Sequence, residues 1–114
     1  MEGDVILTPM AQANGQHKVR PAVILRLLPP FDDALVCGIS TQLHQQVAGF
    51  DETISPVDND FQTSGLAAAS LIRLGYLALI TKRELVLTGA IGTIAPERHE
   101  RLLRTLSNYL TAKL

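Results

Sequence analysis

Short runs of apolar and β-branched residues, separated by polar segments or by glycine and proline, recur over the first 94 residues of the chain. Runs of this length that end at turn residues are typical of β-strands. Gly75 divides one long run, which indicates a bulge or bend there. The pattern predicts strands at residues 5–7, 20–28, 34–40, 52–54, 69–74, 76–81 and 89–94.

The segments between these strands are mostly polar. Residues 8–19 contain the turn signal Asn14-Gly15 and are predicted to form a long loop, and residues 42–49 a second loop that contains His44. Pro29-Pro30 ends the second strand. Two further connections are predicted, an acidic turn at residues 58–60 and one helical turn at residues 82–85.

The last part of the chain changes period. Pro96 suits the first position of a helix and Glu97 suits its positive N-terminus, although Ala95 is a poor cap. The apolar residues that follow have the spacing of one helix face. They are Leu102, Leu103, Leu106, Tyr109, Leu110 and Leu114. The sequence therefore predicts one terminal amphipathic helix.

Closely spaced strands followed by one helix favour a mainly β (α+β) fold, in which a strongly bent antiparallel sheet or small barrel carries the helix on one face. At 114 residues the chain has the length of one domain, so we expect a single domain over residues 1–114. The chain has no Trp, two Tyr and three Phe, so its core must be mainly aliphatic.

Composition and charge narrow the surroundings and partners. No apolar run approaches the roughly 20 residues of a membrane span, and no basic-then-apolar leader is visible, so we expect a cytoplasmic protein without membrane contact. The single Cys37 lies in an apolar run and is expected to be a buried structural thiol. The net charge is −1, so any nucleic-acid binding must use a local basic patch.

Several kinds of enzyme site are missing from the sequence. His17, His44 and His99 are isolated from one another, without the spacing of metal ligands. No glycine-rich phosphate loop and no nucleophile elbow occurs. We therefore predict no metal and no cofactor.

The remaining candidates are polar residues at strand ends. His17, Lys18 and Arg20 follow the first loop, Ser40, Thr41 and Gln42 end a strand, and Arg73 interrupts an apolar run. Each has a structural alternative. Arg20 could be a solvated strand end, Ser40 and Thr41 could satisfy backbone groups of a turn, and Arg73 could pair with Asp58 or Asp60.

The order of these fragments resembles the MazF/PemK family of toxins. The matching fragments span residue 3 to about residue 110, and five of them occur in the family's order. They are Gly3-Asp4-Val5, Arg20-Pro21-Ala22-Val23-Ile24, Ile39-Ser40-Thr41-Gln42, Ser64-Gly65-Leu66 with Ser70-Leu71-Ile72-Arg73, and the C-terminal third with Leu79-Ile80-Thr81-Lys82, Gly92-Thr93-Ile94 and Pro96-Glu97.

The resemblance implies an SH3-like barrel with a C-terminal helix, assembled as a homodimer and inhibited by an antitoxin protein. It implies metal-independent endoribonuclease cleavage of single-stranded RNA at a short recognition sequence, leaving a 2′,3′-cyclic phosphate and a 5′-OH. By motif position, the catalytic residues would be Arg20, Ser40 and Arg73. The RNA-binding residues would be His17, Lys18, Thr41, Gln42 and Tyr76.

The chain departs from some relatives after Arg73. Gly75, Tyr76 and Ala78 stand where those relatives carry an acidic residue, a glutamine and an arginine, so a carboxylate that could act as base is missing. His17 could serve as the base at neutral pH instead, and Tyr76 could stack a base.

Three alternatives remain open from the sequence. The first is a catalytically impaired family member that only binds RNA or an antitoxin. The second is a gyrase poison of the CcdB type, which is disfavoured because such proteins depend on a tryptophan and this chain has none. The third is an SH3-like peptide-binding barrel, which would need an aromatic-lined groove.

Overall fold

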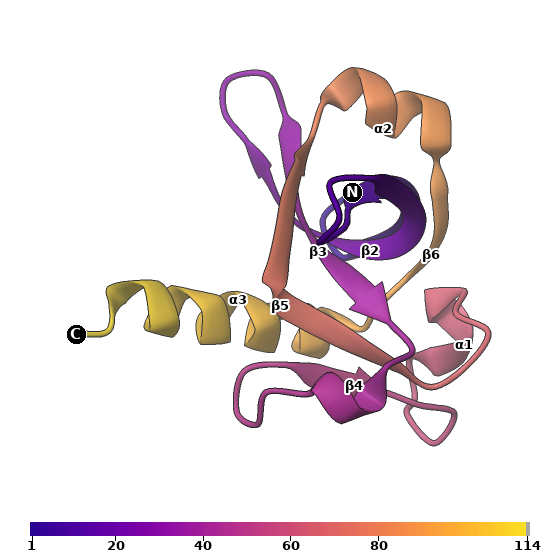
Figure 1. Cartoon of the computed structure of the whole chain (residues 1–114), viewed down its shortest axis with the longest axis vertical. Helices are drawn as coiled ribbons and strands as arrows, with labels where there is room; N and C mark the ends of the chain where they lie inside the picture. The colour runs from indigo at the N-terminus through magenta and orange to yellow at the C-terminus, as the bar shows by residue number, and fades with distance from the viewer. Residues whose placement is uncertain (114) are drawn as a thin grey trace.

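Six strands form one sheet in the order β4-β5-β3-β2-β1-β6, and each pairing is antiparallel. The structure is a computed structural model that describes residues 1–113 (Figure 1). The strands are β1 (Asp4–Ala11), β2 (His17–Leu28), β3 (Asp33–Ser40), β4 (Glu52–Ile54), β5 (Ser70–Ile80) and β6 (Ala90–Thr93). The helices are the 3-10 turn η1 (Leu43–Gln45), α1 (Phe61–Ser64), α2 (Lys82–Thr88) and α3 (Pro96–Thr111).

The sheet bends into a half-barrel and buries apolar side chains on both of its faces. One cluster, which includes Val23, Cys37 and Leu74, is covered by Leu102 and Leu106 of α3. The other cluster includes Met10 and is covered by Leu85 of α2. Alternate residues of a strand point to opposite faces, so one sheet supplies both clusters. The predicted mainly β fold with a C-terminal helix is confirmed.

Residues 8–19 form a β-hairpin, and the prediction of a long loop there is wrong. Thr8 and Met10 are buried, so β1 keeps its alternation up to Ala11. β2 begins at His17, and Thr8 pairs with Arg20. β6 pairs with β1 only at the first three residues of β1. Within the described residues, no strand therefore pairs with the outer edge of β1 at Pro9, which lacks an N–H.

β5 is one strand, where two strands were predicted on either side of Gly75. The predicted bulge is present, because the register between β3 and β5 shifts between Cys37 and Ile39. Cys37 pairs with Leu77, whereas Ile39 pairs with Ile72. The two pairings leave residues 73–76 of β5 opposite a single residue of β3, Gly38.

The terminal helix begins at Pro96, as predicted. Ala95 provides no side-chain cap. Its backbone N–H donates instead to Oδ2 of Asp60 (3.0 Å), which compensates for the missing cap. The end of the apolar stripe is not covered, since Tyr109 and Leu110 are 67% and 70% exposed. Leu114 lies outside the described residues.

A buried ionic cluster links α3 to β4 and to the loop before α1. Arg98 donates to both carboxylate oxygens of Asp60 (2.8 and 3.2 Å) and to Glu52 (2.9 Å), and lies 3.4 Å from a carboxylate oxygen of Asp58. Burial alone would raise the pKa of Asp60, but hydrogen bonds from Arg98 and from the Ala95 N–H outweigh it, so the pKa is lowered. The same contacts raise the pKa of Arg98 against its burial.

The single thiol is structural. Cys37 is fully buried in the cluster under α3, and burial raises its pKa to about 12. A thiol with such a pKa stays protonated and unreactive at neutral pH. The expected buried thiol is confirmed.

Candidate functional site

The candidate site is a pocket of about 300 Å³ where the β1–β2 hairpin, the end of β3 and the bulge of β5 meet. Five of the residues singled out from the sequence line it, although they come from three different strands and a loop. The lining residues are Ala11, Gln12, Ala13, Arg20, Ser40, Gln42, Gln45, Arg73 and Tyr76. The fold thus gathers Arg20, Ser40, Gln42, Arg73 and Tyr76 in one place.

Arg20 is half-buried on β2, and its guanidinium is held from one side. One terminal nitrogen donates to Oε1 of Gln12 (3.1 Å). The Nε atom is buried and has no acceptor among residues 1–113. A buried cationic donor without an acceptor costs free energy. An anionic acceptor entering the pocket would therefore be favourable.

Ser40 is buried at the end of β3 and closes the turn that follows. Its Oγ accepts a hydrogen bond from the backbone N–H of Gln42 (3.1 Å). The structural alternative for Ser40 is thus realised in the fold. The bond uses only an acceptor position of the hydroxyl, whose proton remains available to a ligand in the pocket.

Arg73 faces the pocket from β5, on the side of the strand opposite to Ile72 and Leu74, which belong to the cluster under α3. Its guanidinium lies over the ring of Tyr76, with the Cζ atom 5.5 Å from the ring centroid, a cation–π geometry. The alternative that Arg73 pairs with Asp58 or Asp60 is wrong. Both carboxylates belong to the ionic cluster around Arg98.

Tyr76 connects the β5 side of the pocket to β3 and to the end of β1. A Cβ atom built on Gly38 would lie 2.3 Å from the Tyr76 ring, so the ring fits against β3 only because residue 38 is glycine. The hydroxyl donates to the carbonyl of Ala11 (2.8 Å) and accepts from Nε2 of Gln12 (2.8 Å).

The charged side chains that line the pocket in the described chain are all positive. Arg20 and Arg73 contribute two guanidinium groups, and the other polar lining side chains of the described chain are amides and hydroxyls, without a carboxylate. The protein as a whole has a net charge of −1, so the positive potential is local. Two arginines beside a hydroxyl and amides form a site for a phosphate-sized anion.

Three of the predicted RNA-binding residues do not line this pocket. His17 lines a neighbouring, more apolar pocket between the hairpin and α2. Lys18 and Thr41 are exposed beside the site. Within residues 1–113, no group of three or more potential ligands could hold a metal ion. Nor does that part of the chain contain a helix long and apolar enough to cross a membrane.

Sequence reasoning missed Gln12 and Gln45. Gln45 lies in the segment predicted as the second loop, and Gln12 directly follows β1 in the segment predicted as the first loop. Every second residue of this part of β1 is buried, namely Ile6, Thr8 and Met10. This alternation is the sequence signal that could have located Gln12 at the end of a strand. A period of two through Met10 places the strand end, and hence Gln12, beside the start of β2.

Fold and pocket together define a small half-barrel protein with a cationic pocket at one end of its sheet. Over residues 1–110 the sequence matches a known family, described as the PemK-like, MazF-like toxin of type II toxin-antitoxin systems. The chain belongs to this family, and we therefore describe it as a toxin of a type II toxin–antitoxin system.

A solved structure supports the same fold. The toxin MazF-mt6 of Mycobacterium tuberculosis is similar with a TM-score of 0.61, covering 97% of this chain and 99% of that chain. The two sequences are 18% identical, so the likeness concerns the fold alone. Among curated proteins, none matches the chain.

Proposed function

We propose that this toxin is a metal-independent, sequence-specific endoribonuclease of single-stranded RNA, acting on mRNA in the cytoplasm. The observation that carries the proposal is the pocket in which Arg20, Arg73 and Ser40 converge without a lining carboxylate among residues 1–113. Such a pocket attracts a phosphodiester and stabilises additional negative charge on it. Membership of the toxin family supports RNA as the substrate.

In the proposed reaction the 2′-oxygen attacks the adjacent phosphorus and the bond from phosphorus to the 5′-oxygen breaks. The 2′-OH gives up a proton to a base, and the departing 5′-oxygen takes one up. The products are a 2′,3′-cyclic phosphate and a 5′-OH. In this scheme Arg20 binds the equatorial oxygens of the phosphorane, Arg73 neutralises its charge, and Ser40 donates a hydrogen bond.

The scheme requires a base that takes the proton of the 2′-OH. His17, three residues before Arg20, carries an imidazole, the side chain that most often acts as a general base, and is our candidate. It lies on the same strand as Arg20 but lines the neighbouring pocket. Among residues 1–113, no carboxylate that could act as this base lines the pocket. This favours a second interpretation, in which the toxin binds RNA or its antitoxin without cleaving RNA.

The flanking residues would bind the RNA on either side of the scissile phosphate. Lys18 extends the positive surface along β2, beside the imidazole of His17, and Thr41 and Gln42 extend the polar surface beyond β3. The Tyr76 ring provides an aromatic surface for a base. These five residues form the proposed RNA-binding surface.

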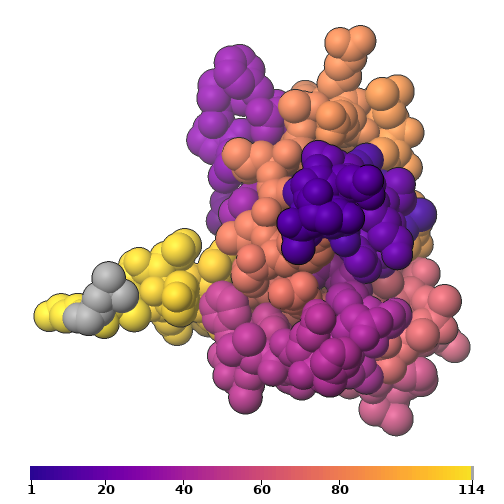
Figure 2. All heavy atoms as spheres, in the orientation of Figure 1, coloured from indigo at the N-terminus to yellow at the C-terminus, as the bar shows by residue number. Residues whose placement is uncertain are grey.

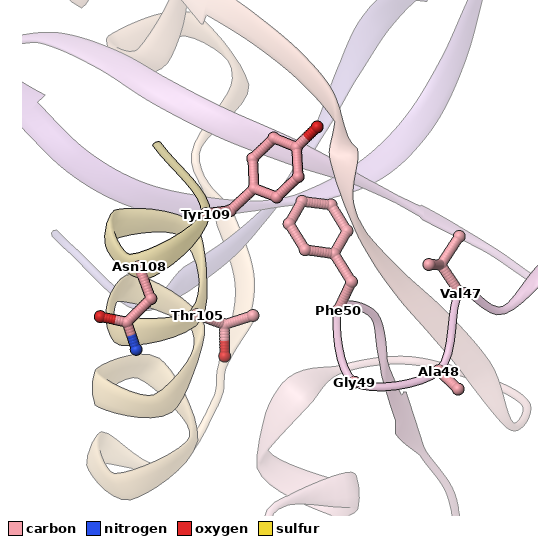
Figure 3. A pocket seen from close by; sticks show the side chains of 7 residues that line it. All are labelled: Val47, Ala48, Gly49, Phe50, Thr105, Asn108 and Tyr109. Carbon is pink, nitrogen blue, oxygen red and sulfur yellow. The ribbon is translucent and has the colours of Figure 1, made fainter. Parts of the chain in front are cut away.

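We also propose a homodimer formed through the face of the sheet that carries α3. Leu77 and Leu79 pair with residues 37 and 35 of the core cluster under α3, so their side chains share that face, and they are 41% and 65% exposed. Phe50 and Tyr109 extend this apolar face, with their ring centroids 5.2 Å apart (Figure 3). They line an open groove between the loop before β4 and α3.

The proposed antitoxin is a protein with an acidic segment, extended or helical, that covers the Arg20 and Arg73 surface. Positive potential gathered at the RNA pocket of a near-neutral protein favours such a partner, which could fold on contact. An antitoxin complex that blocks cleavage with Arg20 and Arg73 still exposed would refute this part.

The experiment is induced expression of the wild type and of Arg20→Ala in bacteria, with growth curves and mapping of RNA 5′ ends. We expect growth arrest and new 5′-OH ends within a common short sequence for the wild type alone. Growth arrest without new RNA ends, or equal arrest by a folded Arg20→Ala protein, would refute the proposal.

A further inference from the structure

Arg20 sits at the start of a directed chain of hydrogen bonds. Its guanidinium donates to Oε1 of Gln12 (3.1 Å), Nε2 of Gln12 donates to the Tyr76 hydroxyl (2.8 Å), and that hydroxyl donates to the Ala11 carbonyl (2.8 Å). Each link uses a donor that meets an acceptor. The chain therefore connects β2 to β5 and back to the end of β1.

The partners fix the orientation of the Gln12 amide. Nε2 also donates to the carbonyl of Met10 (3.0 Å), which can only accept. Arg20 can only donate, so the amide oxygen must face it. Gln12 is half-buried, and with both ends of its amide engaged it is a rigid support for Arg20.

Tyr76 is in turn fixed by its surroundings. Its ring occupies the space left by Gly38, where even a methyl group would lie 2.3 Å from the ring. The guanidinium of Arg73 lies over the same ring. Tyr76 thus contacts Arg73 directly and is linked to Arg20 by the hydrogen bonds of Gln12.

We infer that Gln12 and the Tyr76 hydroxyl are positioning residues, which hold the Arg20 guanidinium in the orientation that phosphate binding requires. The inference rests on the proposed function for its effect on catalysis, but not for its effect on Arg20 itself. A long side chain loses rotamer freedom when it is held. If the Arg20 side chain is already held in the free protein, this loss of rotamer freedom is not added to the barrier of the reaction. Accurate placement also matters, because a misplacement of about 1 Å can cost roughly 10²-fold in rate.

The test compares Gln12→Met, which keeps the length and apolar shape of the side chain, with Tyr76→Phe, which keeps the ring. Gln16→Met is the matched control, because Gln16 lies in the same hairpin and, among residues 1–113, its side chain hydrogen-bonds only to Asn14. Two measurements are made on each protein. The first is the ¹⁵N heteronuclear NOE of the Arg20 Nε–H group, assigned by its loss in Arg20→Lys, and the second is the kinetics of RNA cleavage.

We expect an ordered Arg20 Nε–H in the wild type and in Gln16→Met, and a mobile one in Gln12→Met and Tyr76→Phe. We expect kcat to fall roughly tenfold to hundredfold in these two variants with KM nearly unchanged. A merely structural role would lower the melting temperature but leave the Arg20 signal and kcat, measured well below melting, as in the wild type.

The outcomes separate the inference from the proposed function. An Arg20 signal that stays ordered in both variants overturns the inference, whether or not the wild type cleaves RNA. So do variants with mobile Arg20 and wild-type kcat. A wild type that leaves RNA intact refutes the proposed function, while loosening of Arg20 in the two variants would still support the positioning role.

Discussion

Arg20 combines two features that seldom occur together, a half-buried guanidinium and a buried Nε without an acceptor in the described chain. In a purely structural arginine, burial is accompanied by carboxylates, as around Arg98. The contrast between these two arginines favours a ligand-binding role for Arg20.

Substitution of Arg20 should separate charge from geometry. We expect Arg20→Ala to lose roughly 10²–10³ in cleavage rate, the typical cost of one preorganised donor. Arg20→Lys should be badly impaired too, because an ammonium cannot reproduce the bidentate contact with phosphate oxygens. Initial rates and melting temperatures measure both effects, and full activity of a folded Arg20→Ala protein would refute the catalytic role.

Ser40→Ala should be milder in rate and measurable in stability. A neutral hydroxyl stabilises less developing charge than a guanidinium, so we expect a smaller loss of rate than in Arg20→Ala. The lost hydrogen bond from the Gln42 N–H should lower the free energy of unfolding by about 1 kcal/mol. Denaturant titration checks this value, and a rate loss larger than that of Arg20→Ala would contradict the assignment.

At the scale of elements, the ionic cluster around Arg98 is the main polar tie between α3 and the sheet. Arg98→Met should lower the free energy of unfolding by about 3–5 kcal/mol, because Asp60 would stay buried without its partner. Arg104→Met is the control, since within residues 1–113 Arg104 pairs only with the exposed Glu100 and contributes about 0.5 kcal/mol or less. Urea titration at pH 7 provides the comparison.

Acid should reduce the difference between wild type and Arg98→Met. The folded-state pKa of Asp60 is lowered, so its contribution is complete above the unfolded-state value of about 3.9 and is lost as pH falls through the folded-state value. In Arg98→Met, burial dominates and protonation of Asp60 relieves the unpaired charge. The same destabilisation at pH 3 as at pH 7 would contradict this view.

The strands with regular apolar patterns and the terminal helix could be predicted from the sequence, because period alone specifies which face is buried. The β1–β2 hairpin could not, since Thr8 and Pro9 look like loop residues until Thr8 is seen to be buried. Family motifs located Arg20, Ser40 and Arg73. Gln12 escaped because its role depends on a contact with Tyr76 across 64 positions of sequence.

At the scale of the whole molecule, α3 projects from the body, and its C-terminal half stands clear in the space-filling view (Figure 2). Tyr109 and Leu110 on this half are exposed, as are Leu77 and Leu79 of the sheet. Exposed apolar surface of this extent marks an interaction site. A two-fold partner would cover the same face on both chains.

Leu79→Asp should therefore convert the dimer to a monomer. A carboxylate placed on each chain would be buried in the interface without a partner. Val86→Asp is the control, because Val86 is 77% exposed on α2, away from this face, and should remain dimeric. Light scattering at tens of micromolar (an order-of-magnitude choice) measures the mass, and a monomeric wild type would refute the dimer.

The most direct measurement incubates the purified toxin with a long single-stranded RNA in EDTA and determines both end groups. We expect cleavage within one short sequence, 5′-OH and 2′,3′-cyclic phosphate ends, and no cleavage when the nucleotide 5′ of the scissile bond is 2′-deoxy. Arg20→Lys should cleave at least tenfold more slowly. Intact RNA, cleavage that survives the 2′-deoxy substitution, or a requirement for metal would contradict a metal-independent ribonuclease built around Arg20.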